Sequence, residues 1–351
     1  MPTEKKEVCI AKSDYLNIDI DKLLAPLGGM QNFVKPGEKV LLKVNLLSAT
    51  TPEKAVTTNP AMVIAVANAV KKAGGEPFIG DSGWGRFTKN RLEKLYENTG
   101  MKKVAEELEI ELNYDTTYKT VKIKQGKKLK KAHICNFYLN ADKTIALPKI
   151  KTHSLMIMTL ATKIMYGVVP GLTKAKYHAL YPKRKAFAEI LIDILSVTTP
   201  DLYIMDGVIG MMGEGPQTGI PVELGVVLAS KDAVAMDLAV CEMLGIEPTK
   251  IPTLKRANIR KMWPLEIEYP LLNPKDVKYT GFQMPKTTNK KLKFGPVVME
   301  KCTACGKCKE ICPKDAIKIT EKAKIDNSNC IRCYCCMEVC PEDAIELVVF
   351  R

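Results

Sequence analysis

Eight cysteines near the C-terminus constrain this chain more than any other feature, because they repeat with one spacing. A Cys-x2-Cys-x2-Cys-x3-Cys-Pro motif begins at Cys302, and the same motif begins again 28 residues later at Cys330. The segments that follow also match, since Lys314–Ile317 corresponds to Glu342–Ile345. The pattern indicates an internal duplication. Three thiolates at this spacing hold three corners of a cubane [4Fe–4S] cluster, and the cysteine before the proline ligates the other cluster.

The spacing therefore predicts two clusters with crossed ligands. One cluster is expected to take Cys302, Cys305, Cys308 and Cys340, and the other Cys330, Cys333, Cys336 and Cys312. Zinc would need four donors in separated pairs, and a disulfide scaffold would spread its cysteines through a small secreted domain. The extra cysteine of this segment, Cys335, is expected to be a packing thiol, with a role as an alternative ligand left open.

The segment from Pro296 onward resembles bacterial-type two-cluster ferredoxins over about 55 residues, with every ligand present. The resemblance implies a small α+β ferredoxin-like domain that transfers one electron at a time. It does not name the electron donor or acceptor.

The first 270 residues alternate between strand and helix patterns. A helix is predicted over 61–73, where Asn59 is the cap and Pro60 takes the first helical position, and it lies between buried strands at 39–45 and 77–81. Further helices are predicted at 91–108, 156–166, 187–197 and 233–244, and further strands at 144–153, 202–206 and 222–228. This order implies right-handed crossovers, so the fold class is predicted to be α/β, with one or more mostly parallel sheets and flanking helices.

The predicted domains are an α/β domain at 1–270, as one or two lobes, a linker at 271–295 and the two-cluster domain at 296–351. The linker is rich in Pro, Lys, Asn and Thr and lacks periodicity. No apolar run approaches the roughly 20 residues of a membrane-spanning helix, and the first residues lack the pattern of a signal peptide. A cytoplasmic protein is expected.

The net charge of +14 lies entirely before Pro296. From that residue onward nine basic residues balance nine acidic ones, whereas the first 295 residues hold 44 basic and 30 acidic residues. Such an excess attracts a redox partner protein with an acidic surface or a small anionic substrate. No stretch interleaves arginine with aromatic residues, so nucleic acid is not expected. A solvated, lysine-rich surface explains the excess without a ligand.

One segment of the α/β domain carries a candidate anion site. In an extended chain Lys149, Lys151 and His153 project to one side, where two ammonium groups would lie beside an imidazole. Mutual repulsion would lower the pKa values of the lysines, and the imidazole could exchange protons. An exposed edge strand whose lysines discourage aggregation explains the same pattern. His133 and His178 could be ligands, but surface or packing roles are expected for both.

Two further candidates follow predicted strands. The glycine-rich stretch after Asp206 contains Gly213 and Gly215, and it could bring backbone amides close to a ligand or simply be a flexible connection. Asp81 could bind a cation, a hydroxyl or a lysine, or it could be a turn aspartate.

These segments resemble the domain of unknown function 362 family over roughly residues 39–245. The resemblance rests on Lys43-Val-Asn45, 57–60, 80–82, Leu147-Pro-Lys-Ile-Lys-Thr-His153, 159–167, and Asp206 with 213–216. In the family pattern a Lys-Asn pair precedes the aromatic residue and glycine of the next helix. Lys163 matches that lysine, whereas Ile164 stands in the place of the asparagine.

Together the residues and the resemblance favour an iron–sulfur oxidoreductase of anaerobic metabolism, with a small anionic substrate or cofactor in the α/β domain. His153, Lys163 and Asp81 are the catalytic candidates. The substrate- or anion-binding candidates are Lys149, Lys151, Lys43, Asp206, Gly213 and Gly215. One alternative is a non-enzymatic electron carrier that docks a redox partner, and another is an isomerase-like enzyme with structural clusters.

Overall fold

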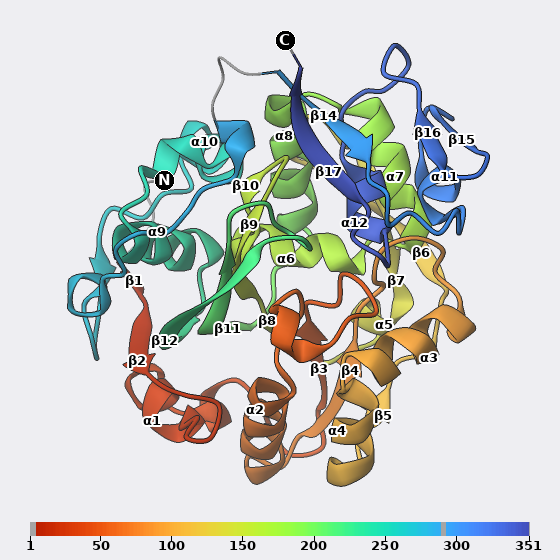
Figure 1. The fold of residues 1–351 in the computed structure, drawn as a ribbon. Helices are drawn as coiled ribbons and strands as arrows, with labels where there is room; N and C mark the ends of the chain where they lie inside the picture. Colours follow the sequence, from red (N-terminus) through yellow and green to blue (C-terminus); the bar gives the residue numbers. More distant parts are fainter. Residues whose placement is uncertain (1–4, 289–292, 351) are drawn as a thin grey trace.

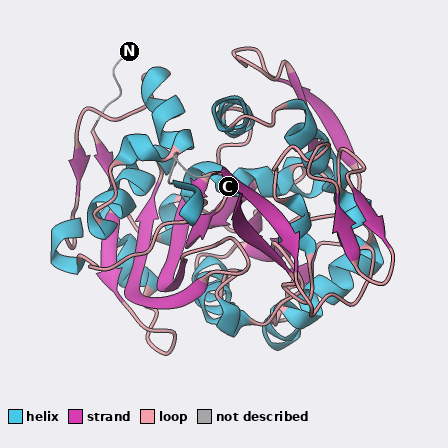
Figure 2. Cartoon of the chain, turned by 45° about the horizontal axis from the view of Figure 1, so that its top comes forward, coloured by secondary structure: helices cyan, strands magenta, loops and turns pink. Residues whose placement is uncertain are grey.

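The computed structural model describes residues 5–288 and 293–350. The first of these ranges contains a nine-stranded sheet with helices on both faces (Figures 1 and 2). The strand order is β10-β9-β11-β8-β3-β4-β5, and β12 lies between β11 and β2. The strands are β2 (Cys9–Lys12), β3 (Lys39–Val44), β4 (Glu76–Gly80), β5 (Glu111–Leu112), β8 (Lys143–Leu147), β9 (Lys149–His153), β10 (Ile157–Met158), β11 (Leu202–Met212) and β12 (Ile220–Ser230).

The central strands pair in parallel, and the antiparallel pairs lie toward one side. The pairs β3–β4, β3–β8, β4–β5, β8–β11 and β9–β11 are parallel, while β9–β10, β11–β12 and β2–β12 are antiparallel. In β3, Leu41 faces one core and Leu42 the other, because successive side chains of a strand point to opposite faces. The prediction of an α/β fold with a mostly parallel sheet is confirmed.

Helices cover each face of this sheet and bury its apolar side chains. The core on one face includes α1 (Ile20–Leu24), α2 (Pro60–Lys72), α3 (Lys89–Asn98) and α4 (Met101–Leu108). The core on the other includes α5 (Asn136–Leu139), α6 (Leu160–Ile164), the 3-10 helix η4 (Met165–Val168), α7 (Gly171–Leu180), α8 (Arg184–Leu195), α9 (Ala233–Leu244) and α10 (Pro252–Ile259). Within the described ranges, no helix is long and apolar enough to cross a membrane.

Local chemistry explains where the predicted helices agree and where they differ. The side chain of Asn59 accepts a hydrogen bond from the backbone N–H of Ala61 at 2.9 Å and caps α2 as predicted. The helix predicted over 91–108 is two helices, α3 and α4, because Gly100 adopts a left-handed conformation with φ of 78°. The predicted strand at 202–206 continues to Met212, so the first half of the glycine-rich stretch is strand and not loop.

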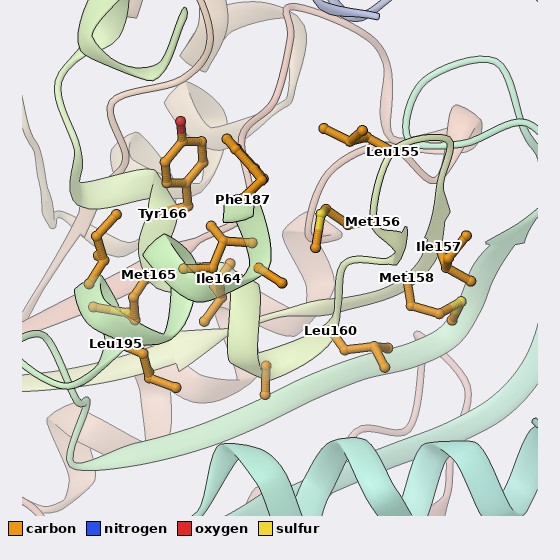
Figure 3. Close-up of a cluster of buried hydrophobic side chains, with 14 of the residues drawn as sticks. Leu155, Met156, Ile157, Met158, Leu160, Ile164, Met165, Tyr166, Phe187 and Leu195 are labelled. Atoms are coloured by element: carbon orange, nitrogen blue, oxygen red, sulfur yellow. The ribbon is translucent and has the colours of Figure 1, made fainter. Parts of the chain in front are cut away.

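The helix predicted at 156–166 is also wrong in its first half. That part forms the short strand β10, and Ile157 and Leu160 adopt positive φ angles of 70° and 54°. Such angles are rare for these side chains, so the surrounding core must hold the turn in place. Figure 3 shows the apolar side chains that do so, including Leu155, Met156 and Met158 of the turn.

The C-terminal module repeats one structural unit twice. Helices α11 (Lys307–Ile311) and α12 (Cys335–Val339) each lie within one cysteine motif, and β15 (Ile317–Ile319) pairs with β16 (Ala323–Ile325). Strand β14 (Lys293–Val298) pairs with β17 (Ile345–Phe350). Smaller antiparallel or parallel pairs elsewhere are β6 (Tyr118–Lys122) with β7 (Lys131–Cys135), and β1 (Lys6–Glu7) with β13 (Ile267–Glu268).

The segment predicted as a linker lies against the α/β domain. The backbone N–H of Gly213 donates to the carbonyl of Gln283 at 2.8 Å, and Thr287 Oγ1 donates to the carbonyl of Ser154 at 2.5 Å. Residues 289–292 of this segment lie outside the described part. The boundaries at 271 and 295 stay predictions.

Candidate functional site

The two cysteine sets surround two separate cavities of about 20 Å³ each. The first is lined by Cys302, Cys305, Cys308 and Cys340. The second is lined by Cys312, Cys330, Cys333 and Cys336, and also by Cys335. Each cavity thus has the four cysteines of one predicted set in its wall, and thiols around a cavity fit a cubane cluster. The assignment of individual ligands, including the role of Cys335, stays a prediction.

Backbone donors to the sulfurs follow the same duplication. The N–H of Ala316 donates to Cys312 Sγ at 3.3 Å, and the N–H of Ala344 donates to Cys340 Sγ at 3.2 Å. These are equivalent positions in the two repeats. Such hydrogen bonds stabilise negative charge on a sulfur and contribute to the reduction potential of a cluster.

The two repeats differ in what their glutamates touch. Glu310 in α11 is exposed, and its Oε2 lies 3.7 Å from Nε of Arg86. Its counterpart Glu338 in α12 is only 3% exposed and lies against the α/β domain. Burial raises the pKa of Glu338 to about 7. The second repeat therefore contributes a buried carboxyl group to the junction of the two domains.

His153 ends β9 and meets this carboxyl group. His153 Nδ1 accepts from the backbone N–H groups of Leu155 and Met156, at 3.1 and 3.3 Å, so Nδ1 carries no proton. Burial and the nearby Lys163 charge hold the pKa of His153 well below its usual range. The neutral ring therefore carries its proton on Nε2, which lies 3.3 Å from Glu338 Oε1. The two atoms are within ion-pair distance but are not aligned as a hydrogen bond, and Glu338 Oε1 has no other partner in the described ranges.

The two lysines of β9 are buried, so the exposed edge strand considered for them is wrong. Strand β9 lies between β10 and β11, and all five of its residues are buried. Lys149 Nζ donates to Asp206 Oδ2 at 2.7 Å and to the Tyr15 hydroxyl at 3.0 Å. Asp206 also accepts from Tyr15 and from the backbone N–H of Asn59, so Lys149 and Asp206 neutralise each other.

Lys151 makes no ion pair with a carboxylate in the described part of the chain. Its Nζ donates to Asn45 Oδ1 at 3.1 Å and to the carbonyl of Val56 at 2.5 Å. Burial, followed by repulsion from Lys163, lowers the pKa of Lys151 to about 7. This ammonium group can therefore release its proton near neutral pH.

Lys43 and Asp81 form a second neutral pair at the carboxyl ends of β3 and β4. Lys43 Nζ lies 2.6 Å from Asp81 Oδ2, and Asp81 Oδ1 accepts from the N–H of Gly83 at 2.6 Å. Gly167 lets η4 approach this pair, because a Cβ atom there would lie 2.4 Å from Lys43 Nζ. Ligands of parallel sheets bind at this edge, so the pair helps to form the wall of a site.

A cavity of about 60 Å³ lies beside this pair, and we call it the lysine cavity. Its polar walls include Asn45, Asp81, Lys163, Lys174 and Glu338. Lys174 of α7 donates to Ser82 Oγ at 2.6 Å and to the carbonyl of Gly83, and burial lowers its pKa to about 8. Among the described residues, Lys163 makes no hydrogen bond or ion pair, and its Nζ lies 5.7 Å from the Tyr166 ring centroid. Burial lowers the pKa of Lys163, while the nearby carboxyl groups of Glu338 and Asp81 act in the opposite direction. Lys163 thus lies beside a cavity without a directly hydrogen-bonded partner.

A buried carboxylate positions the helix that carries Lys163. Asp237 of α9 accepts from the backbone N–H groups of Ala161 and Thr162, at 2.7 and 3.0 Å. These are the first unpaired donors of α6, and a carboxylate there also interacts favourably with the positive end of the helix. Helix α6 is therefore held in place by a side chain of α9, a helix that is far away in the sequence.

The structure brings part of the predicted set together. Lys163 and Asp81 line the lysine cavity, while His153 and Lys151 approach it through Glu338 and Asn45. Gly215 stabilises the end of β9, because its N–H donates to Thr152 Oγ1 and its carbonyl accepts from the Ser154 hydroxyl. Gly213 has φ of 75° and has open space where a Cβ atom would stand. The binding and catalytic roles stay predictions.

Sequence reasoning missed Lys174, Glu338 and Tyr15. Glu338 had a detectable signal, because a glutamate recurs at the same place in both cysteine motifs. Lys174 and Tyr15 lie in segments without a motif. His178 packs beside Trp84 and Phe187, with ring centroids 5.4 and 4.1 Å away, and burial lowers its pKa to about 3.

Comparisons with known proteins agree with these two modules. A family model described as a domain of unknown function, DUF362, matches residues 40–242, and a 4Fe-4S dicluster domain model matches residues 301–344. The Synechocystis sp. protein named "Thylakoid-associated protein sll1697" is 36% identical over 273 residues, which cover 75% of this chain and 81% of that protein.

Two solved structures align more remotely. The lactate racemase apoprotein from Thermoanaerobacterium thermosaccharolyticum is 14% identical with a TM-score of 0.41, over 68% of this chain and 56% of that chain. A Thermotoga maritima protein is 11% identical with a TM-score of 0.32, over 60% of this chain and 55% of that chain. This chain thus spans little more than half of either structure.

The dicluster match and the two cysteine sets imply two [4Fe–4S] clusters and electron transfer. This chain belongs to the DUF362 family and carries a C-terminal 4Fe–4S dicluster domain.

Proposed function

We propose that this protein is an iron–sulfur oxidoreductase that exchanges single electrons with a small anionic substrate, whose reacting group enters the lysine cavity. The observation that carries the proposal is the origin of the cavity walls. Lys163 and Lys174 come from the α/β domain, whereas Glu338 comes from the helix between Cys336 and Cys340. A substrate group in this cavity would touch both the cationic site and the cluster-binding helix.

The lysines supply the charge for anion binding. Among the described residues, Lys163 makes no ion pair and Lys174 donates hydrogen bonds only to neutral groups. Lys43 and Lys149 are neutralised by Asp81 and Asp206, so we assign these pairs to the walls of the site. An anion in the cavity would accept hydrogen bonds from the buried ammonium group of Lys174 and the half-buried one of Lys163, and each charged hydrogen bond contributes about 1.5–3 kcal/mol.

Proton transfer is the second requirement. When bound, the clusters supply or accept one electron each, so a two-electron reduction of the substrate draws one electron from each and consumes two protons. Lys151, with a pKa of about 7, can hold one proton and reaches the cavity through Asn45. Glu338, whose pKa burial raises to about 7, is the second candidate, and the neutral ring of His153 lies beside it with its Nε2 3.3 Å from Oε1. The acid–base role of His153 stays a prediction.

The decisive test is cluster reoxidation. Protein purified anaerobically would first be analysed for a copurifying small molecule, then reduced with dithionite and mixed with that molecule in a stopped-flow instrument. Lys174→Ala and His153→Ala should slow reoxidation at unchanged iron content. Lys176→Ala is the matched control, because Lys176 lies on the same helix and is exposed. Wild-type rates in both test variants would contradict the proposal.

The second candidate is an electron carrier that docks an acidic redox partner. Lys307 and Arg86 favour it, since they place positive charge beside the first cysteine motif. Rapid reoxidation by a partner protein, without reoxidation by any small molecule, would support this function. We also propose a cytoplasmic protein of anaerobic metabolism. The Synechocystis relative is named as thylakoid-associated, so cell fractionation should test whether this protein is associated with membranes.

A further inference from the structure

We infer that a groove between the two domains binds an organic oxyanion, a phosphate- or carboxylate-bearing molecule whose reacting end reaches the lysine cavity. The inference rests on the proposed function for the position of that end. The groove has a volume of about 530 Å³. Pockets for metabolites are typically about 300–1,000 Å³, so the groove can hold one, whereas the 60 Å³ lysine cavity can admit only a small group.

The groove and the lysine cavity adjoin each other. Leu47, Gly83 and Trp84 line both. A molecule in the groove therefore lies beside the lysine cavity. Trp84 forms part of the wall of both the groove and the cavity. Lys307 and Pro341 of the cluster domain line the far wall, next to Cys308 and Cys340 of the first cysteine set.

The groove carries positive charge without balancing carboxylates in its wall. Among the described residues that line it, five are cationic and none is Asp or Glu: Lys54, Arg86, Arg91, Lys94 and Lys307. Two of these have partners outside the groove, since Lys54 contacts Asp343 at 3.2 Å and Arg86 contacts Glu310 at 3.7 Å. The charge left for a ligand is therefore concentrated on the others.

Arg91 is the strongest of these donors. Its guanidinium is half-buried and makes no hydrogen bond or ion pair with any described residue, and it stays charged although burial lowers its pKa. Gly85 provides the space, because a Cβ atom there would lie 2.7 Å from Arg91 Nη2. An unpaired guanidinium in a concave site is suited to two acceptor oxygens of one phosphate or carboxylate.

Two more donors in the same wall lack partners. Trp84 Nε1 and Ser48 Oγ are buried and make no hydrogen bond in the described ranges, and Trp84 as a whole is 5% exposed. Indole and guanidinium groups only donate hydrogen bonds. A ligand rich in acceptor oxygens would satisfy all three groups, whereas a cation or an apolar molecule would leave them unpaired at a cost.

Binding can be tested without turnover, by anaerobic isothermal titration calorimetry of the cluster-loaded protein with pyrophosphate and with citrate. At least one probe should bind, and Arg91→Ala should weaken it about tenfold or more. Lys103→Ala, a change of an exposed lysine on α4, should bind as the wild type does. Arg91→Lys keeps the charge and loses the planar fork, so it should fall between the two. Trp84→Phe, which removes the indole donor and keeps an aromatic ring, should weaken binding severalfold.

The outcomes separate the groove from the proposed redox function. Absence of binding by both probes, or equal affinity in wild type and Arg91→Ala, would overturn the inference. Binding that depends on Arg91 in a protein whose clusters no small molecule reoxidises would support the groove and count against the oxidoreductase. Equal losses in Arg91→Ala and Lys103→Ala would mean nonspecific charge attraction and would also overturn the groove.

Discussion

His153 Nε2 lies 3.3 Å from Glu338 Oε1, and this contact joins strand β9 of the α/β domain to helix α12, which contains the predicted cluster ligand Cys336. Both side chains are nearly inaccessible to water. Gln217 adds a second link, because its Nε2 donates to the carbonyl of Cys340 at 2.8 Å. The cluster domain is therefore fixed to the α/β domain beside the lysine cavity. It is not held at a distance by a flexible tether.

The first prediction uses the duplication as its own control. Glu338→Gln keeps the shape of the side chain but removes its charge and its capacity to hold and release a proton. Reoxidation by the substrate should slow about tenfold or more, because the loss of a proton-transfer group costs at least that much. Glu310→Gln, at the equivalent position of the first repeat, should react at the wild-type rate because Glu310 is exposed. Equal rates in the two variants would remove Glu338 from the reaction, and iron analysis would check that both keep their clusters.

The second prediction concerns crossed ligation. Cys312→Ser should impair the cluster held by Cys330, Cys333 and Cys336, because Cys312 lines the same cavity. Cys335→Ser is the comparison, because Cys335 lines the same cavity but lies outside the repeated spacing, and it should keep about eight irons per chain if Cys335 is a packing thiol. Anaerobic iron analysis with electron paramagnetic resonance would distinguish them. Damage confined to the cluster of the first motif would show that the ligands are not crossed.

The third prediction is a pH dependence. Burial lowers the pKa of Lys174 to about 8, so this lysine is protonated below that pH and neutral above it. Attraction of an anionic substrate should therefore be strongest below pH 8 and decline as the pH rises through it. The second-order rate of cluster reoxidation, measured against pH, should show this decline in the wild type. Lys174→Met should flatten that part of the profile, and an unchanged profile would assign the decline to another group.

The fourth prediction tests how the site is supported. Asp237→Ala removes the carboxylate that accepts from Ala161 and Thr162, and it should destabilise the protein by about 1.5–3 kcal/mol. It should also slow reoxidation by displacing Lys163. Asp232→Ala removes the N-cap of α9 and should cost about 0.5–2 kcal/mol with the reaction unchanged. Thermal inactivation of the cluster-loaded protein would measure the loss of stability. A normal reoxidation rate in Asp237→Ala would separate α6 from the chemistry.

Local patterns were sufficient for many of the elements and for the presence of the clusters. The α2 cap and proline depend on neighbouring residues, and α9 occupies the predicted positions 233–244 because its helical signal is continuous. The helix expected at 156–166 failed for the opposite reason. The turn in this segment has positive φ angles at Ile157 and Leu160, which these residue types rarely adopt. Packing against the surrounding core stabilises this conformation.

The sequence by itself determined the two cluster sites and the fold class, because ligand spacing and hydrophobic periodicity are properties of short segments. Only the tertiary structure decided which lysines remain without a counterion. Lys149 and Asp206 neutralise each other across 57 residues of sequence, while Lys163 meets no carboxylate within hydrogen-bonding distance among the described residues. The pairing of charges depends on distances of a few ångströms between remote segments, and those distances exist only once the strands and helices have packed.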